Sequence, residues 1–271
     1  MVRRIWRHVV LLAIAAVTLI PFMLMVITSL KPSAIAVTSP PVWWFRPTLD
    51  NFRAQFSVDN PILLAMRNSI IVGLSATLLT LMLSVGTAYA LTHYEFRGKD
   101  RYFTSFLALR AVPPIAFVLP YFLIWRNLHL TGTFVPLIVM YLTLCMPFAV
   151  WMMCTFMDEI PIEVEEAALL DGCSRWQTIR HVLAPLIAPG ISATAGLSFI
   201  LVWNEFLYAL FNTTANTRTM PAQIYSQLGY FTTDWSGLSS VAVVSVIPAI
   251  VFVALSQRFI VRGLTGGAVK G

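Results

Sequence analysis

Charged residues are scarce in this chain of 271 residues: they make up 11% of it, whereas about a quarter is usual in a soluble domain. Hydrophobic residues account for 58%. The longest polar connections, roughly 31–67, 158–186 and 211–238, are too short to form a soluble catalytic domain. The shortage of charge therefore excludes a soluble enzyme and indicates a chain that lies mostly in lipid.

Other absences narrow the function further. The sequence has no Gly-x-x-x-x-Gly-Lys-Ser/Thr loop to cradle phosphates, so this chain is not expected to hydrolyse ATP. Its three cysteines, Cys145, Cys154 and Cys173, have neither the pattern of a disulfide framework nor metal-ligand spacing. The histidines are scattered, and the sequence indicates no His/Cys/Asp cluster or nucleophile-base arrangement near a membrane face. We predict no catalytic residues, no metal site and no cofactor bound by this chain.

Six apolar segments are each long enough to cross a bilayer, for which about 20 residues are needed. Because backbone amides in lipid must be bonded within their own segment, the spans are expected to be helices. The sequence therefore predicts an all-α polytopic membrane protein with six transmembrane helices. These helices cover roughly residues 9–30, 68–92, 103–125, 133–157, 187–210 and 239–257.

The distribution of Lys and Arg predicts the orientation. Leaving out Arg110 inside the third segment, eleven basic residues fall on the side of the N-terminus and six on the other. The positive-inside rule then places both termini and the connection 158–186 in the cytoplasm. The basic residues are scattered over short loops and form no single patch, so we expect no nucleic-acid partner. The first segment is longer than the apolar core of a signal peptide, so we expect a retained anchor in the bacterial inner membrane.

The chain divides into three parts. Residues 1–66 hold the first span and an outer loop, and residues 67–257 hold the other spans as one core with the cytoplasmic loop 158–186. Residues 258–271 form a cytoplasmic tail. The glycines and the lack of periodicity from Gln257 onward predict a flexible extension.

The cytoplasmic loop contains the densest acidic cluster of the chain. Pro161 suits the first turn of a helix, and the glutamates that follow complement the helix dipole. Asp171-Gly172 is a turn signal, in which glycine can adopt left-handed geometry. Ser174 and Gln177 have the spacing of a capping box for a second helix. The loop is predicted to be helix, sharp turn, helix; periodicity alone favours a plain surface hairpin between two spans.

The string Glu166-Ala167-Ala168, followed after three intervening residues by Gly172 and then by Pro185, resembles the cytoplasmic loop of binding-protein-dependent ABC importer permeases. Val182 and Ala184 depart from the Ile and Leu of that pattern. The resemblance implies the type I ABC importer transmembrane fold and a loop that docks on a separate ATPase subunit, which holds the ATP. The ATPase-coupling residues implied are Glu166, Ala167, Ala168, Asp171 and Gly172.

Two further strings are similar to those of carbohydrate permeases of the maltose-transporter type: Trp203-Asn204-Glu205-Phe206 and the C-terminal 263–271. Aromatic rings beside hydrogen-bonding groups are suited to gripping a sugar, and an acid near a span usually faces a polar interior. The substrate path implied consists of Trp203, Asn204, Glu205, Phe206 and Tyr208. The alternative is an interfacial aromatic belt with Glu205 in water at the outer surface.

The resemblance also implies the smaller of two permease subunits, working with a second permease subunit, an ATPase subunit dimer and a periplasmic or lipid-anchored substrate-binding protein. The outer loop 212–240 then faces the binding protein, although a plain connector also fits it. The binding-protein-facing residues implied are Gln223, Tyr225, Gln227 and Tyr230.

Arg110 is the one clear charge within a span. At a rise of about 1.5 Å per residue, Arg110 and Glu205 lie at different depths, so we expect no direct ion pair between them. Arg110 is instead expected to reach inward or to bond loop carbonyls. A secondary transporter or channel without a motor is the competing function. It predicts inverted repeats or several mid-membrane charges, and the sequence has neither.

Overall fold

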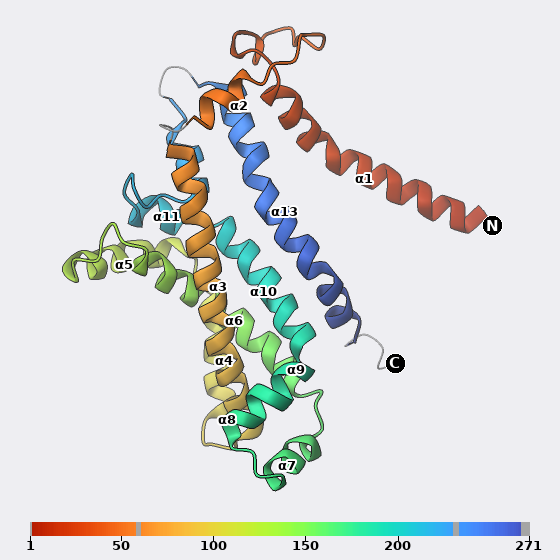
Figure 1. Ribbon diagram of the computed structural model, residues 1–271, viewed down its shortest axis with the longest axis vertical. Helices are drawn as coiled ribbons and strands as arrows, with labels where there is room; N and C mark the ends of the chain where they lie inside the picture. Colours follow the sequence, from red (N-terminus) through yellow and green to blue (C-terminus); the bar gives the residue numbers. More distant parts are fainter. Residues whose placement is uncertain (1, 58–60, 230–232, 267–271) are drawn as a thin grey trace. The chain divides into compact units, whose positions relative to one another are not determined.

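The computed structural model describes residues 2–57, 61–229 and 233–266, and every regular element in these ranges is helical. The chain forms two compact units, residues 1–66 with 223–248 and residues 67–222 with 249–271. Figure 1 labels the helices along the chain. Their bounds are α1 Val2–Ser29, α2 Asp50–Gln55, α3 Pro61–His93, α4 Lys99–Ala108, α5 Ile115–Asn127, α6 Val135–Met157, α7 Ile162–Leu170, α8 Arg175–Thr178, α9 Ala184–Leu186, α10 Ala188–Trp203, α11 Leu207–Asn212, α12 Met220–Ser226 and α13 Trp235–Gly266, with short 3-10 turns at Ser33–Ile35 and Leu109–Ala111 and a π-helical turn at Ile179–Leu183.

The unit that contains the N-terminus joins α1, α2 and the first part of α13 through polar side chains. The Asn51 side-chain amide donates hydrogen bonds to the carbonyls of Ser29, at 2.7 Å, and Lys31, at 2.8 Å. The Ser33 hydroxyl donates to Asp234, at 2.9 Å. These bonds hold the residues after α1 against the segment that begins α13, a grouping that sequence patterns did not indicate.

The larger unit is built around α6, which packs along α10 and also contacts α4, α5 and α11 (Figure 1). Apolar side chains form two clusters within it. One cluster joins the part of α3 near Val72 to α5, α6 and α11, with Tyr141 and Tyr208 among its buried members. The other joins the end of α3 near Tyr89 to α6 and to the residues around Leu183. α6 therefore carries side chains into both clusters, as expected of a central helix.

Gly73 and Gly86 of α3 have different surroundings. A Cβ atom at Gly73 would lie 3.0 Å from the Phe199 ring, so α3 and α10 approach through this glycine. Ser69, the residue one helical turn earlier, accepts a hydrogen bond from the backbone of Met220, at 2.7 Å. Gly86, by contrast, has nothing within 4 Å of its Cβ position. Close helix contact on α3 therefore occurs at Gly73, while the Cβ position of Gly86 faces open space.

Four uninterrupted helices are long and apolar enough to cross a membrane, and the predicted number of six is reached when each of two bent helix pairs is taken as one crossing. The third segment, predicted over roughly 103–125, is divided into two helices. Helical residues 99–111 and 115–127 meet at 98°, because the pair Pro113-Pro114 removes backbone donors and blocks continuation of the helix. The segments 175–186 and 188–203 meet at 79°, so the fifth crossing begins at a bend.

The flexible extension predicted from Gln257 is wrong as far as the structure describes the chain. α13 continues through Gly266 without a break. The first glycine after Gln257 is Gly263, so several residues with ordinary helical backbone preferences carry the helix forward. The prediction gave too much weight to the glycines near the end. Residues 267–271 lie outside the described part of the chain.

Asn68, near the start of α3, provides a test of the larger unit. Its side-chain amide is fully buried and donates hydrogen bonds to the carbonyls of Asn216, at 2.9 Å, and Arg218, at 3.0 Å. Asn68→Leu leaves both carbonyls without this donor and should lower the free energy of unfolding by about 1–3 kcal/mol. The measurement is thermal unfolding in mild detergent.

The matched control for this prediction is Thr155→Val. Thr155 is exposed on α6, and its hydroxyl donates only to the Trp151 carbonyl of the same helix. Its loss should change the free energy of unfolding by less than about 0.5 kcal/mol. Equal unfolding temperatures for the parent and Asn68→Leu would contradict the assigned role.

Candidate functional site: a helix pair between two spans and an aromatic pocket

The predicted helix, sharp turn and helix are confirmed between α6 and α10. α7 begins directly after Pro161, which is its N-cap, and Glu163 and Glu165 occupy the first turn. Gly172 has φ of +88°, the left-handed geometry expected there. Its N–H donates to the Leu169 carbonyl, and the N–H of Cys173 donates to the Ala168 carbonyl, both at 3.1 Å. This pair of bonds is a Schellman motif, which ends α7 and reverses the chain.

The second helix starts with the predicted capping box. The Ser174 side chain accepts from the backbone N–H of Gln177, and the Gln177 side chain accepts from the backbone N–H of Ser174 at 2.7 Å. α8 then continues through a π-helical turn, Ile179–Leu183, into α9. Local sequence signals therefore account for both helix ends that face the turn.

α7 has two distinct faces. Glu166, Ala167 and Leu170 are exposed at helical spacing, and Leu170 is 88% exposed. Asp171 and Gly172 are exposed in the turn. Trp176 on α8 is 68% exposed, so apolar and acidic groups lie together on this free surface. We name the surface of Glu166, Ala167, Leu170, Asp171 and Trp176 the loop surface.

The opposite face of α7 consists of Glu165 and Ala168, its only buried residues. Ala168 was grouped with the coupling residues, and the structure places it against this chain itself. Glu165 was not singled out by sequence reasoning. Its carboxylate accepts a hydrogen bond from the Tyr89 hydroxyl and lies 3.0 Å from Nε2 of His93. The sequence could have indicated this position of Glu165, because it lies three residues before Ala168 and residues three apart share one face of a helix.

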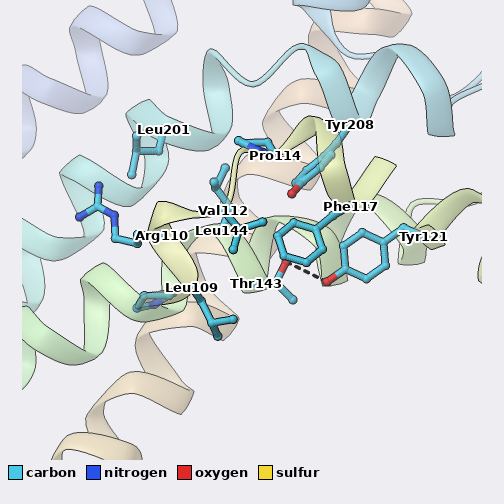
Figure 2. Close-up of a pocket in the computed structure, with 11 residues that line it drawn as sticks. Leu109, Arg110, Val112, Pro114, Phe117, Tyr121, Thr143, Leu144, Leu201 and Tyr208 are labelled. Carbon is cyan, nitrogen blue, oxygen red and sulfur yellow. Dashed lines mark hydrogen bonds between the residues drawn. The ribbon is translucent and has the colours of Figure 1, made fainter. Parts of the chain in front are cut away.

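A pocket of about 280 Å³ lies where α5, α6, α10 and α11 meet beside the break at Pro113-Pro114. Figure 2 shows the rings of Phe117, Tyr121 and Tyr208 gathered on one side of it. The Tyr121 hydroxyl donates to Thr143 at 3.3 Å, and the Tyr121 and Tyr208 rings meet edge to face at 6.3 Å. The pocket thus combines aromatic faces with hydroxyl groups.

Arg110 lines the other end of this pocket (Figure 2). Its guanidinium lies over the Phe148 ring, 5.5 Å from the centroid. The ion pairs among the described residues do not include Arg110, which agrees with the expectation that it makes no pair with Glu205. The contact with Phe148 was not predicted. In place of a loop carbonyl, an aromatic ring of α6 partners the cation.

The string Trp203-Asn204-Glu205-Phe206 forms the break between α10 and α11. The Glu205 carboxylate accepts hydrogen bonds from the backbone N–H of Tyr208, at 3.0 Å and 3.1 Å, and thereby caps α11. Asn204 is exposed at the end of α10, and its side chain donates to the Ile200 carbonyl at 2.9 Å. Trp203 is buried and stacks on Phe199. Of the five residues named for a substrate path, only Tyr208 lines the pocket.

Sequence reasoning missed Phe117, Tyr121 and Thr143 as pocket residues. They lie on two different crossings, so no single string contains them. The signal that could have found them is the position of Phe117 and Tyr121 immediately after the double proline, where a span is expected to break.

The residues named for an outward-facing loop have varied surroundings. Gln223 is buried, Tyr225 is half exposed at 50%, and the Gln227 side chain donates to Gln55 at 2.8 Å. Tyr230 lies outside the described residues.

Comparison with known proteins supplies the family. Residues 81–266 match the family described as binding-protein-dependent transport system inner membrane component. The chain is 36% identical over 256 residues to the sulfoquinovosyl glycerol transport system permease protein SmoH of Agrobacterium fabrum, covering 93% of this chain and 89% of that protein. It is 39% identical to the trehalose transport system permease protein SugB of Mycobacterium tuberculosis, covering 83% and 82%.

A third relative is the trehalose/maltose transport system permease protein MalG of Thermococcus litoralis, 33% identical, with 95% of this chain and 93% of that protein covered. Among solved structures, a chain of a bacterial ABC transporter involved in the import of the acidic polysaccharide alginate superposes with a TM-score of 0.79. Its sequence identity is 20%, and the match covers 94% of this chain and 95% of that chain. The shared fold is therefore that of an ABC importer transmembrane subunit.

Proposed function

The chain belongs to the family of binding-protein-dependent transport system inner membrane components and is a permease of an ABC importer; from this premise we propose that its cargo is a carbohydrate. It is a multi-pass inner-membrane protein, and the ATPase is a separate subunit. We propose further that ATP bound by that subunit drives this chain between inward-open and outward-open states.

The loop surface is the observation that carries the proposal of ATPase docking. Glu166, Leu170 and Trp176 are exposed on a helix pair whose turn is fixed by the Schellman motif and the capping box. The exposed surface of the pair has a fixed shape, with apolar side chains at its centre and acidic groups around them. A complementary groove on a partner can bind such a surface specifically. ATP shifts the equilibrium between the two states only through its different affinity for them.

The pocket beside Pro113-Pro114 supports a carbohydrate cargo. The axial hydrogens of a sugar pack on aromatic faces such as those of Phe117 and Tyr121, while its hydroxyls need partners such as Thr143 and Tyr208. The relatives named for sulfoquinovosyl glycerol, trehalose and maltose transport support the same class of cargo. The proposed substrate path therefore retains Tyr208 from the sequence prediction and adds Phe117, Tyr121 and Thr143, which line the same pocket.

The proposed assembly contains this chain, a second permease subunit, an ATPase subunit dimer and a substrate-binding protein outside the membrane. In it both termini of this chain are cytoplasmic, as the distribution of basic residues favours. The exposed Tyr225 on α12 is the described residue of the outer loop best placed to meet the binding protein.

Copurification in mild detergent tests the assembly. A tagged chain should bring an ATPase subunit and a second permease, and proteoliposomes made from the complex should take up sugar only with ATP and the binding protein. A panel of disaccharides, oligosaccharides, polyols and sugar acids identifies the cargo. Uptake by the isolated chain without a nucleotide would instead establish a secondary transporter or channel.

Substitution of Gly172 tests the docking role of the turn. Gly172→Pro removes the N–H that bonds to Leu169 and imposes a φ near −65° where the structure has +88°, so the turn cannot form. The variant should insert in the membrane, while binding-protein-stimulated ATPase activity and uptake both fall more than about tenfold, a loss typical of a broken coupling.

Gly172→Asn is the matched control, because asparagine tolerates left-handed backbone geometry and keeps the N–H. It should retain most of the uptake. Parent-like uptake and ATPase activity in Gly172→Pro would show that the turn does not connect the ATPase to the membrane helices.

Tyr121→Ala tests the pocket. Loss of one aromatic face should lower the catalytic efficiency of uptake by about threefold to tenfold, the size expected for an aromatic contact. Sugar affinity of the binding protein and ATPase activity without sugar should stay unchanged, because neither involves this pocket. Leu123→Ala, which removes a side chain exposed elsewhere on α5, is the control. Equal sugar uptake by both variants would exclude the pocket from the path.

A further inference from the structure

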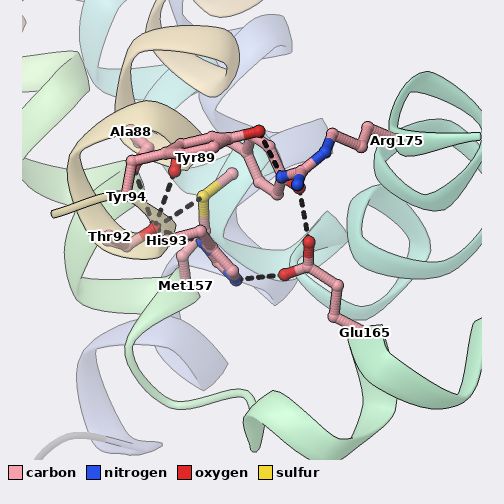
Figure 3. Close-up of polar contacts among 8 residues, drawn as sticks. All are labelled: Ala88, Tyr89, Thr92, His93, Tyr94, Met157, Glu165 and Arg175. Atoms are coloured by element: carbon pink, nitrogen blue, oxygen red, sulfur yellow. Dashed lines mark hydrogen bonds and ion pairs between the residues drawn. The ribbon is translucent and has the colours of Figure 1, made fainter. Parts of the chain in front are cut away.

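A buried polar cluster connects the cytoplasmic helix pair to the end of α3. Glu165 of α7 is 5% exposed, and both of its carboxylate oxygens have partners on α3. The Tyr89 hydroxyl donates to one oxygen, and Nε2 of His93 lies 3.0 Å from the other. Figure 3 shows the Glu165 side chain extending from its helix toward these two residues.

The partners of Glu165 are themselves held in place. The Tyr89 and His93 rings stack at 4.6 Å, since residues four apart lie on one helix face. The other ring nitrogen of His93, Nδ1, is 2.6 Å from the Thr92 hydroxyl. The two groups that meet the carboxylate are therefore part of an ordered last turn of α3.

The second helix of the pair is tied to the same place. Arg175, the first residue of α8, donates a hydrogen bond to the Tyr94 hydroxyl, and its guanidinium lies 5.0 Å from the centre of the Tyr94 ring. Tyr94 packs edge to face on Tyr89 at 5.9 Å. Both helices of the pair thus contact the aromatic cluster at the end of α3, Glu165 through Tyr89 and Arg175 through Tyr94.

Little else holds α7 to the rest of this chain. Of its nine residues only Glu165 and Ala168 are buried, and an alanine buries a single methyl group. α8 buries only Thr178. Little apolar surface of α7 is therefore fully buried, and Glu165 with its two partners on α3 is the buried polar contact of this helix. Burying a carboxylate costs free energy, because the charge loses its water. Here the hydrogen bond from Tyr89 and the contact with His93 offset that cost.

We infer that Glu165 is a positioning residue that transmits movement of the ATPase to α3. A helix held by a partner on its exposed face transmits movement directly to α3 only if its opposite face is fixed to α3. Glu166, Ala167 and Leu170 lie on the exposed face, and Glu165 fixes the other. The inference rests on the proposed function and assigns the mechanical link within this chain, from α7 through Glu165 to Tyr89 and His93.

The experiment uses the full transporter in proteoliposomes and measures sugar molecules imported per ATP hydrolysed. This ratio does not depend on how much folded complex is present, so a loss of stability alone does not change it. Glu165→Ala removes both contacts and should lower the ratio about tenfold while the complex still copurifies and hydrolyses ATP. Glu165→Gln keeps one oxygen that accepts from Tyr89 and should give an intermediate ratio.

Variants of the partners make the test independent of any one substitution. Tyr89→Phe and His93→Leu should each lower the ratio severalfold, and neither should lower it further in a chain that already carries Glu165→Ala. If Glu165→Ala fails to assemble, these two variants decide the question. Glu159→Ala, which removes an exposed glutamate of the same loop outside the cluster, is the matched control and should keep the parent ratio.

A parent ratio in Glu165→Ala, Tyr89→Phe and His93→Leu would overturn the inference and leave the proposed function standing. A parent complex that imports no sugar with ATP would overturn the proposed function instead, and this is measured first.

Discussion

Backbone groups in lipid must find hydrogen-bond partners within the protein, and this constraint governs where the helices of this permease can break. The break between α10 and α11 is made by residues that supply such partners. Asn204 returns its side-chain donor to the Ile200 carbonyl, and Glu205 receives the free N–H of Tyr208. The string Trp203-Asn204-Glu205-Phe206, which resembles part of a sugar site in sequence, therefore stabilises the helix break.

The second consequence of that constraint is the pocket. A double proline stops the third crossing at residues that cannot continue a helix, and the two parts meet at 98°. The turn brings Phe117 and Tyr121 opposite Thr143 and Tyr208, which lie on other crossings. The pocket thus results from a broken span, and its aromatic and hydroxyl groups come together only through the packing of α5, α6 and α11.

The helix pair between α6 and α10 is exposed, so its backbone groups do not all need partners within the protein. Water can satisfy its backbone, so its shape depends on local capping at Gly172, Ser174 and Gln177 and its attachment depends on few side chains. The same short helix presents Glu166 to its surroundings and Glu165 to α3, although the two glutamates are neighbours with the same chemistry. Their roles differ because successive residues of a helix point about 100° apart.

Features decided by a few neighbouring residues were predictable from the sequence. The capping box, the left-handed Gly172, the end of α7 and the apolar length of the spans all depend on interactions within about five residues or on composition alone. The exact course of the tail was misjudged, since helix propagation through Gly266 depends on the preceding turns more than on the glycines.

The sequence by itself determined that this is a helical membrane chain with a bent helix pair between two spans and no nucleotide site of its own. Only the tertiary structure decided which residues meet: Glu165 with Tyr89 and His93, Arg110 with Phe148, and Tyr121 with Thr143 and Tyr208. These contacts join residues far apart in the chain, and their formation depends on how bent helices pack, which no local pattern encodes.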